Sequence, residues 1–112
     1  ELAPDDPLPY MNRANALLKA DQFGMALMDY DTAIELDPKY ADAYFNRATA
    51  YEEIMEFEKA VEDYTKAIKL NPEDAMAYNR RGLLRREMGQ ESQARKDLAK
   101  AASIDPSMRI DE

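Results

Sequence analysis

The sequence has no cysteine and no histidine, and it has only three glycines. Without cysteine the chain cannot form a disulfide, a thiolate nucleophile or a thiolate metal ligand. Without histidine it has no imidazole that could serve as a general base or as a metal ligand. The glycines, Gly24, Gly82 and Gly89, are dispersed, so the chain has no glycine-rich phosphate-binding loop. We therefore expect a protein that is not an enzyme and that holds neither a cofactor nor a metal ion.

Long apolar runs and an excess of positive charge are also missing. No stretch approaches the roughly 20 apolar residues of a membrane helix, so we expect no membrane partner. The 112 residues include 15 Lys and Arg against 23 Asp and Glu, a net charge of −8. Because phosphate binding needs a concentrated basic surface, we expect no nucleic-acid partner. The lack of cysteine suits any compartment; we expect the cytoplasm, although the sequence does not determine it.

What the sequence does contain is a repeat. The segments YMNRAN, YFNRAT and YNRRGL begin at Tyr10, Tyr44 and Tyr78, so each begins 34 residues after the one before. Other residues recur on the same spacing, namely Pro38, Pro72 and Pro106; Ala26, Ala60 and Ala94; Ala33, Ala67 and Ala101; and Asp29, Asp63 and Asp97. Three copies follow, at 7–40, 41–74 and 75–108. An acidic, proline-rich extension at 1–6 precedes them and a short tail at 109–112 follows.

Each copy predicts two helices. In the second copy the apolar residues of the segment 57–70 recur at three-and-four spacing, which is typical of a helix. An earlier helix is expected over 41–54. The linkers DPKYADA and NPEDAMA each contain a proline that disfavours helix in the residue before it, so the second helix ends there. No segment alternates as a strand does, and we expect an all-α fold.

Small residues recur where the two helices of a copy would meet, at Ala14, Ala48 and Gly82 on the first helix, with tyrosine and phenylalanine on either side. A single hairpin of this kind cannot bury its own apolar face, so neighbouring hairpins must stack. This pattern of aromatic, small, alanine and proline positions resembles the tetratricopeptide repeat, a family whose period is known to be 34 residues. The resemblance covers 7–108. It implies three antiparallel helix-turn-helix hairpins stacked into a right-handed α-solenoid, with the first helix of each hairpin lining a concave groove.

The repeated arginines and aspartates predict ion pairs. Arg13, Arg47 and Arg81 share one position of the first helix, and Asp29, Asp63 and Asp97 share one position of the second. In an antiparallel hairpin these positions lie at similar heights, so each arginine is expected to pair with an aspartate of its own repeat or of a neighbour. The alternative is a row of arginines that face a ligand. We favour the structural interpretation.

The asparagines are the better candidates for binding. Asn12 and Asn46 precede the arginines by one residue and therefore point about 100° away around the helix. By the resemblance, that direction faces the groove, and family members that hold extended peptides use such asparagine rows. An amide offers both a donor and an acceptor, so it can pair with a peptide backbone of any sequence. The predicted peptide-binding residues of the groove are Met11, Asn12, Asn15, Phe45, Asn46, Thr49, Met76, Asn79, Arg80 and Leu83. The alternative is that these asparagines are only solvated residues of an inner wall.

One subset of the family binds the C-terminal carboxylate of heat-shock chaperones through two asparagines, two lysines and an arginine. The positions that match this clamp are Asn15, Asn46 and Arg80. The two lysine positions hold Met11 and Met76, which removes much of the attraction for a terminal acid. The resemblance therefore implies at most a weak chaperone-tail binder. An uncharged or mixed-charge internal peptide fits the sequence better.

Three functions follow from the sequence. The favoured one is a non-catalytic scaffold that binds an extended segment of a partner protein in the groove. The second is a structural spacer, or a segment that self-assembles head to tail into a weak homo-oligomer through uncapped repeat ends. In favour of self-assembly, the first copy has three basic and five acidic residues while the third has seven basic and four acidic. Ile104, Met108 and Ile110 are then expected to be exposed, unless a further repeat follows. The third function is the weak carboxylate clamp.

Overall fold

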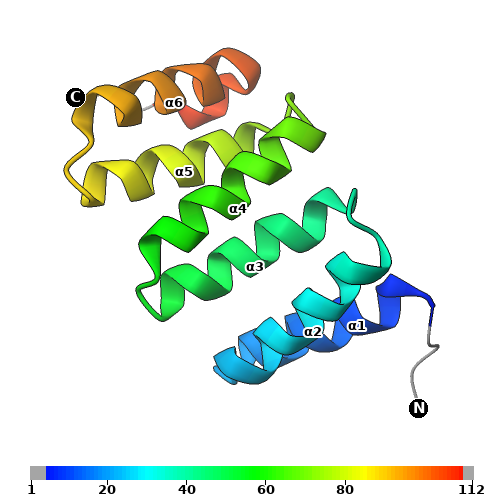
Figure 1. Ribbon diagram of the computed structural model, residues 1–112. Helices are drawn as coiled ribbons and strands as arrows, with labels where there is room; N and C mark the ends of the chain where they lie inside the picture. The colour runs from blue at the N-terminus through cyan, green and yellow to red at the C-terminus, as the bar shows by residue number, and fades with distance from the viewer. Residues whose placement is uncertain (1–4, 110–112) are drawn as a thin grey trace.

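The computed structural model describes residues 5–109, which form a curved array of helices (Figure 1). The helices are α1 (Pro7–Lys19), α2 (Phe23–Leu36), α3 (Ala41–Glu53), α4 (Phe57–Leu70), α5 (Ala75–Glu87) and α6 (Glu91–Ile104), followed by the short 3-10 helix η1 (Pro106–Met108). The described residues contain no strand, so the all-α prediction is confirmed. Most of the predicted extension and tail, with Ile110, lies outside the described residues.

The ends of the helices follow from local sequence. Asp6 caps α1 by accepting a hydrogen bond from the backbone N–H of Leu8 at 3.0 Å, and Pro7 occupies the first helical position, where a missing N–H costs nothing. Each hairpin turn then needs one residue in the left-handed region. Asp21, Met55 and Gly89 fill that position, with φ of 60°, 63° and 82°. Only the glycine adopts this conformation without strain.

The two helices of each hairpin pack closely because small residues lie between them. Ala14, Ala26, Ala48 and Ala60 are fully buried. At Gly82 an added Cβ would lie 2.9 Å from Cγ of Leu98, closer than real Cβ atoms approach a neighbour. The third hairpin therefore depends on a glycine where the first two have alanine.

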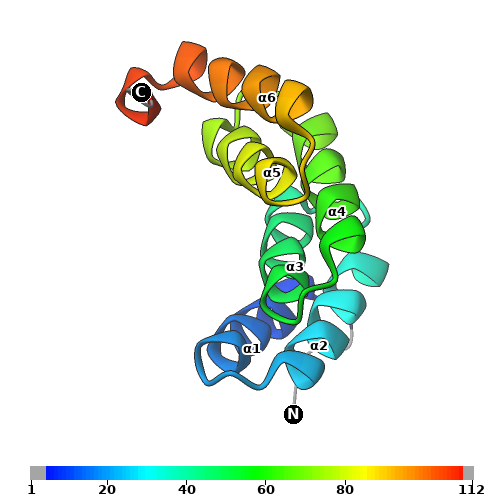
Figure 2. The same cartoon turned by 90° about the vertical axis from the view of Figure 1, so that its left-hand side faces the viewer.

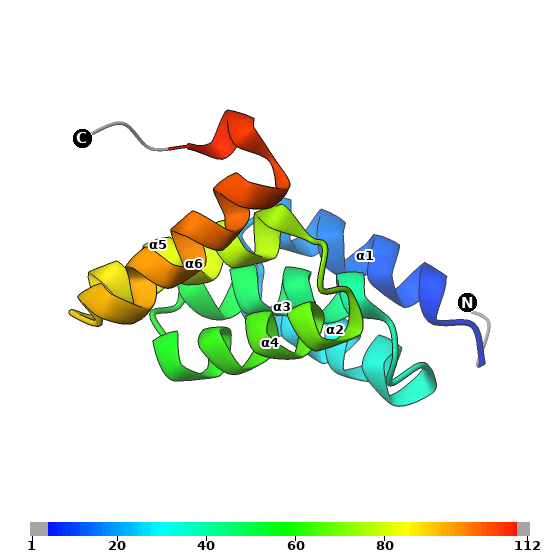
Figure 3. The ribbon, with the colours of Figure 1, turned by 90° about the horizontal axis from the view of Figure 1, so that it is seen from above.

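Successive hairpins are rotated relative to one another, so the array curves. Viewed from above, α1 and α6 slope in opposite directions (Figure 3). From the side, α1, α3 and α5 lie along the inner edge of the curve and α2, α4 and α6 lie along its outer edge (Figure 2). Between the layers, Tyr30 and Tyr64 are the largest fully buried side chains. The stack of hairpins predicted from the 34-residue spacing is thus confirmed.

Candidate functional site

The arginine and aspartate positions meet within each hairpin. Arg13 Nε donates to Asp29 Oδ2 at 2.6 Å, and its Nη2 donates to Oδ1 at 2.8 Å. The same two bonds recur at 2.7 and 2.8 Å between Arg47 and Asp63, and at 2.8 and 2.7 Å between Arg81 and Asp97. All three aspartates are buried. The arginines therefore hold the two helices of a hairpin together and do not form a row that faces a ligand.

A third bond ties two of these arginines to the preceding hairpin. Arg47 Nη1 donates to Asp31 Oδ1 at 2.8 Å, and Arg81 Nη1 donates to Thr65 Oγ1 at 3.0 Å. The hydrogen bonds with Asp63 raise the pKa of Arg47 above its usual value, so it stays charged. Arg13, in the first hairpin, has a side chain that is 55% exposed, compared with 20% for Arg47 and 13% for Arg81. The arginines therefore become less exposed from the first hairpin to the third.

The tyrosines that open each repeated segment support these arginines. Each guanidinium lies over the ring of the tyrosine three residues earlier, at 6.0 Å for Arg13 over Tyr10, 5.7 Å for Arg47 over Tyr44 and 5.8 Å for Arg81 over Tyr78. A cation over an aromatic face at this range is attracted by the ring quadrupole. The spacing of tyrosine and arginine in YMNRAN, YFNRAT and YNRRGL is therefore a packing unit.

Two of the predicted asparagines join adjacent repeats on the inner side of the curve. Asn46 Nδ2, on α3, donates to Asn15 Oδ1, on α1, at 3.1 Å. The hydroxyl of the buried Tyr30 donates to the same oxygen at 2.7 Å. Within the described residues the Asn15 amide nitrogen and the Asn46 carbonyl oxygen make no hydrogen bond. The pair therefore offers one donor and one acceptor, both half-buried and held from beneath by a tyrosine.

The next polar group along the inner side is an ion pair. Glu52 accepts a hydrogen bond from the hydroxyl of Tyr64, and its Oε1 lies 3.6 Å from Arg80 Nη2. Burial raises the pKa of Tyr64 to about 12, which extends to alkaline pH the range in which its hydroxyl is a donor. Arg80 thus lies beside a carboxylate, which reduces its attraction for an acidic ligand. Sequence reasoning missed this partnership because the two residues come from different repeats.

The other predicted groove residues differ in how far their side chains are exposed to solvent. Met76 and Leu83 are exposed, at 45% and 43%, and Asn12 is exposed as well. Asn79 and Thr49 are half-buried, and the Thr49 hydroxyl bonds to the backbone of its own helix. Phe45 is also half-buried, with its ring 5.4 Å from that of Tyr64 in an edge-to-face contact. Within this predicted set, the exposed apolar side chains therefore come from the third repeat.

The prediction that Met11 lines the groove is wrong. Its side chain is only 4% exposed and belongs to a core cluster with Ala14 of its own helix and Ala43 and Ala50 of α3. Alanines on the facing helix leave room for a long, flexible side chain, which methionine fills readily. Met11 is therefore not available to a peptide.

Two hollows lie at the ends of the array and not on its inner side. One, of about 580 Å³, lies against α6 and is lined in part by Arg95, Leu98 and Ala99. The other, of about 230 Å³, is lined by residues of α1 and α2 that include Met25 and Met28. No predicted peptide-binding residue lines either hollow.

Residues 5–109 contain neither a membrane-spanning helix nor a cluster of metal ligands. None of the helices there combines the length and the apolar character needed to cross a bilayer. No group of three or more acidic side chains in that range is placed to hold a metal ion.

Comparisons with known proteins agree with the repeat. Family models described as "Tetratricopeptide repeat" match residues 41–74 and 63–96, and one described as "TPR repeat" matches residues 21–54. The solved TPR domain of OM64 from Arabidopsis is 32% identical, with a TM-score of 0.87 over 90% of this chain and 84% of that one. The chain belongs to the tetratricopeptide-repeat (TPR) family. No curated protein sequence matches it.

Two further TPR-like structures resemble this array. MamA is 29% identical with a TM-score of 0.91 over 95% of this chain, which spans 62% of the length of that MamA chain. The first TPR of Spaghetti (RPAP3), solved with the HSP90 peptide SRMEEVD, is 27% identical with a TM-score of 0.88, over 94% of this chain and 83% of that one. The TPR fold and these neighbours support a protein-interaction scaffold as the general class of function.

Proposed function

We propose that the inner side of this TPR array binds an extended segment of a partner protein and that the chain carries out no catalysis of its own. The observation that carries this proposal is the Asn15–Asn46 pair, which offers a donor and an acceptor across adjacent repeats. An extended peptide presents backbone N–H and C=O groups that such a pair can bind irrespective of side chains. In support, a structural neighbour, the first TPR of Spaghetti (RPAP3), was solved with a bound peptide.

The pair is organised before any peptide arrives. The Tyr30 hydroxyl and the Asn46 amide both hold the Asn15 oxygen, so the Asn15 side chain has lost its freedom to rotate. Binding groups that are already ordered lose less conformational entropy on association. Met76 and Leu83 would add apolar contact area further along the same side, beside the Glu52–Arg80 ion pair.

The charges of the inner side favour an uncharged or mixed-charge internal segment over an acidic chain terminus. Glu52 lies beside Arg80, and Asp42 is exposed on α3. Met11, in one of the two positions where the chaperone clamp has lysine, is buried. An acidic tail would therefore meet a single cation that a neighbouring carboxylate already offsets.

The test is a selection from a peptide library displayed both internally and with free C-termini. Wild type would be compared with the Asn15→Ala, Asn46→Ala double variant and with Gln93→Ala, which removes an exposed amide from α6. We expect wild type and Gln93→Ala to enrich the same internal motif and the double variant to lose it. If the double variant keeps the motif, or if no variant enriches one while circular dichroism shows an intact fold, the proposal is wrong. Enrichment that requires a free C-terminus would instead favour the carboxylate clamp.

A further inference from the structure

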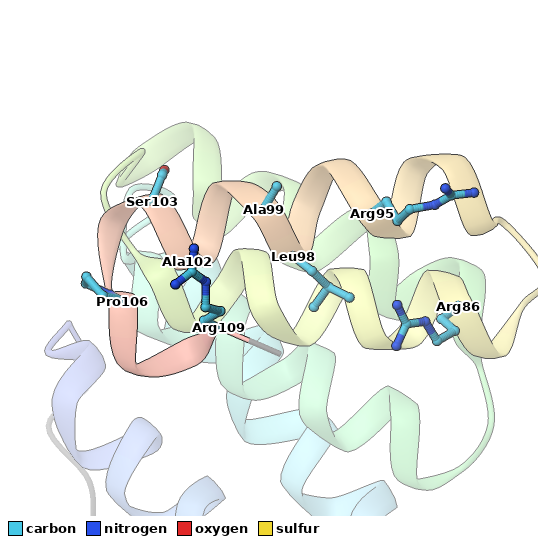
Figure 4. A pocket seen from close by; sticks show the side chains of 8 residues that line it. All are labelled: Arg86, Arg95, Leu98, Ala99, Ala102, Ser103, Pro106 and Arg109. Atoms are coloured by element: carbon cyan, nitrogen blue, oxygen red, sulfur yellow. The ribbon is translucent and has the colours of Figure 1, made fainter. Parts of the chain in front are cut away.

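The hollow at the C-terminal end of the array is shaped to accommodate a helix. It lies along α6, with Arg86 of α5 at one end and Arg109, after η1, at the other (Figure 4). The α6 residues that line it include Arg95, Leu98, Ala99 and Ala102. Their spacing of three and four places them on one face of the helix. The hollow is therefore an elongated depression about 580 Å³ in volume along one helix face.

The equivalent face of α4 shows what such a surface accommodates. Tyr64 and Ile68 of α4 occupy the positions that Leu98 and Ala102 occupy on α6, and they are 0% and 8% exposed. Tyr64 lies in one core cluster with Phe45 of its own hairpin and Leu84 of α5, the helix that follows α4. On α6 the smaller Leu98 and Ala102 line the hollow, and Leu98 is only 8% exposed because it also packs against Gly82 of its own hairpin. Since a helix packs on this face at the earlier junction, the hollow matches a helix more closely than an extended strand.

The chemistry of the hollow does not suit another TPR hairpin. At the two internal junctions an incoming arginine bonds to Asp31 or Thr65 of the preceding helix. The equivalent position on α6 is Ala99, which has no side-chain acceptor. A second copy stacked head to tail would bring Arg13 to this position, and Arg95 and Arg109 line the same hollow. Like charges would meet where the array elsewhere forms a hydrogen bond.

We propose that this hollow binds an amphipathic helix of a partner protein that carries carboxylates beside its apolar face. Ala99 and Ala102 would contact the apolar face and allow a close approach, with the small exposed part of Leu98 between them. Arg95 and Arg109, both exposed, would pair with the carboxylates, and the arginine fork suits carboxylate binding. Arg95 occupies the repeat position that holds the apolar Leu27 and Val61 in the earlier repeats. Of these three equivalent positions, only the one on α6 therefore carries a positive charge.

The probe for this proposal is a designed amphipathic helix with a leucine and alanine face flanked by glutamates. Its matched partner carries lysines in place of the glutamates and keeps the same apolar face. Binding is measured by fluorescence anisotropy against wild type, against Arg95→Glu with Arg109→Glu, and against Lys69→Glu with Lys96→Glu. The last variant makes the same change in net charge with residues that do not line the hollow.

We expect the glutamate helix to bind wild type and the lysine control, and to bind the arginine variant at least about tenfold more weakly. The Asn15→Ala, Asn46→Ala variant should bind it unchanged, which separates this surface from the groove. The proposal is overturned if the lysine helix binds as well, if both charge-reversed variants weaken equally, or if the glutamate helix does not bind. It is also overturned if wild type self-associates in sedimentation at low salt and Arg95→Glu abolishes that association, because the occupant would then be a second copy.

Discussion

Replacing Arg47 with methionine should destabilise the array more than the same change at Arg13. Arg47 makes three charge-assisted hydrogen bonds, two of them to the buried Asp63. Removing it leaves a carboxylate whose side chain is 8% exposed without its cation. Stranding one member of a buried ion pair costs about 3–5 kcal/mol, a large share of a typical free energy of unfolding of roughly 5–15 kcal/mol. Asp29 is as buried as Asp63, with a side chain that is also 8% exposed, so the loss of Arg13 should be costly as well. It should cost less than the loss of Arg47, because Arg13 is 55% exposed and makes two of these hydrogen bonds where Arg47 makes three.

The pH dependence of the Arg47→Met variant provides a second readout. Burial already raises the pKa of Asp63 in the wild type, and hydrogen bonds from Arg47 oppose that rise. Without Arg47 the pKa of Asp63 should rise further above its unfolded value. The protonated carboxyl is then favoured in the folded state, so the penalty is present at neutral pH and shrinks as the pH falls through the raised pKa.

The assay is urea unfolding followed by circular dichroism at pH 7 and at about pH 4.5, with Arg13→Met as the matched comparison. A further variant, Arg47→Met with Asp63→Leu, removes both charges and should recover much of the lost stability. The reasoning is refuted if Arg47→Met and Arg13→Met cost the same. It is refuted equally if the loss in Arg47→Met does not diminish at low pH.

Three further changes test other parts of the structure. Met55→Gly should raise the free energy of unfolding by about 1 kcal/mol, because Met55 is exposed and has a left-handed φ. Gly89→Ala should lower it by a similar amount, and thermal melts measure both changes. Gly82→Ala should cost about 1–3 kcal/mol in urea unfolding, because the added Cβ overlaps α6; no loss would mean that the hairpin adjusts freely. In an ultraviolet titration Tyr30 and Tyr64 should ionise near pH 12, because burial raises their pKa values to about 12. Because both pKa values are raised in the folded state, the stability that the two protonated tyrosines contribute should be lost as the pH rises from about 10 to 12. Ionisation of every tyrosine by pH 11 in the folded protein would contradict this.

Much of the fold could be predicted because each hairpin repeats the same arrangement of residues and contacts. Prolines at a spacing of 34 residues mark where the hairpins end, and the helix expected over 41–54 is observed as Ala41–Glu53. The arginine and aspartate positions recur in step, and in an antiparallel hairpin that recurrence alone places them opposite one another. Information confined to one repeat was thus readable from the sequence.

The candidate site was harder to predict because it depends on how one repeat meets the next. Met11 is buried because the facing positions on α3 are alanines, a fact about size in a different repeat. Glu52 pairs with Arg80 through the rotation between the second and third hairpins, which no spacing in the sequence specifies. The Asn15–Asn46 bond depends in the same way on the first junction.

The arginine bonds between hairpins differ in chemistry at the two junctions. The first is closed by an ion pair, Arg47 with Asp31, and the second by a bond from Arg81 to the neutral hydroxyl of Thr65. Asp31 is 53% exposed, so salt should weaken the first of these contacts more than the second. Bending at the first junction should therefore soften with ionic strength. The second junction should respond through its own ion pair, Glu52 with Arg80, and not through the bond to Thr65. Because the Asn15–Asn46 pair spans that first junction, the salt concentration around the protein would adjust the spacing of its donor and acceptor.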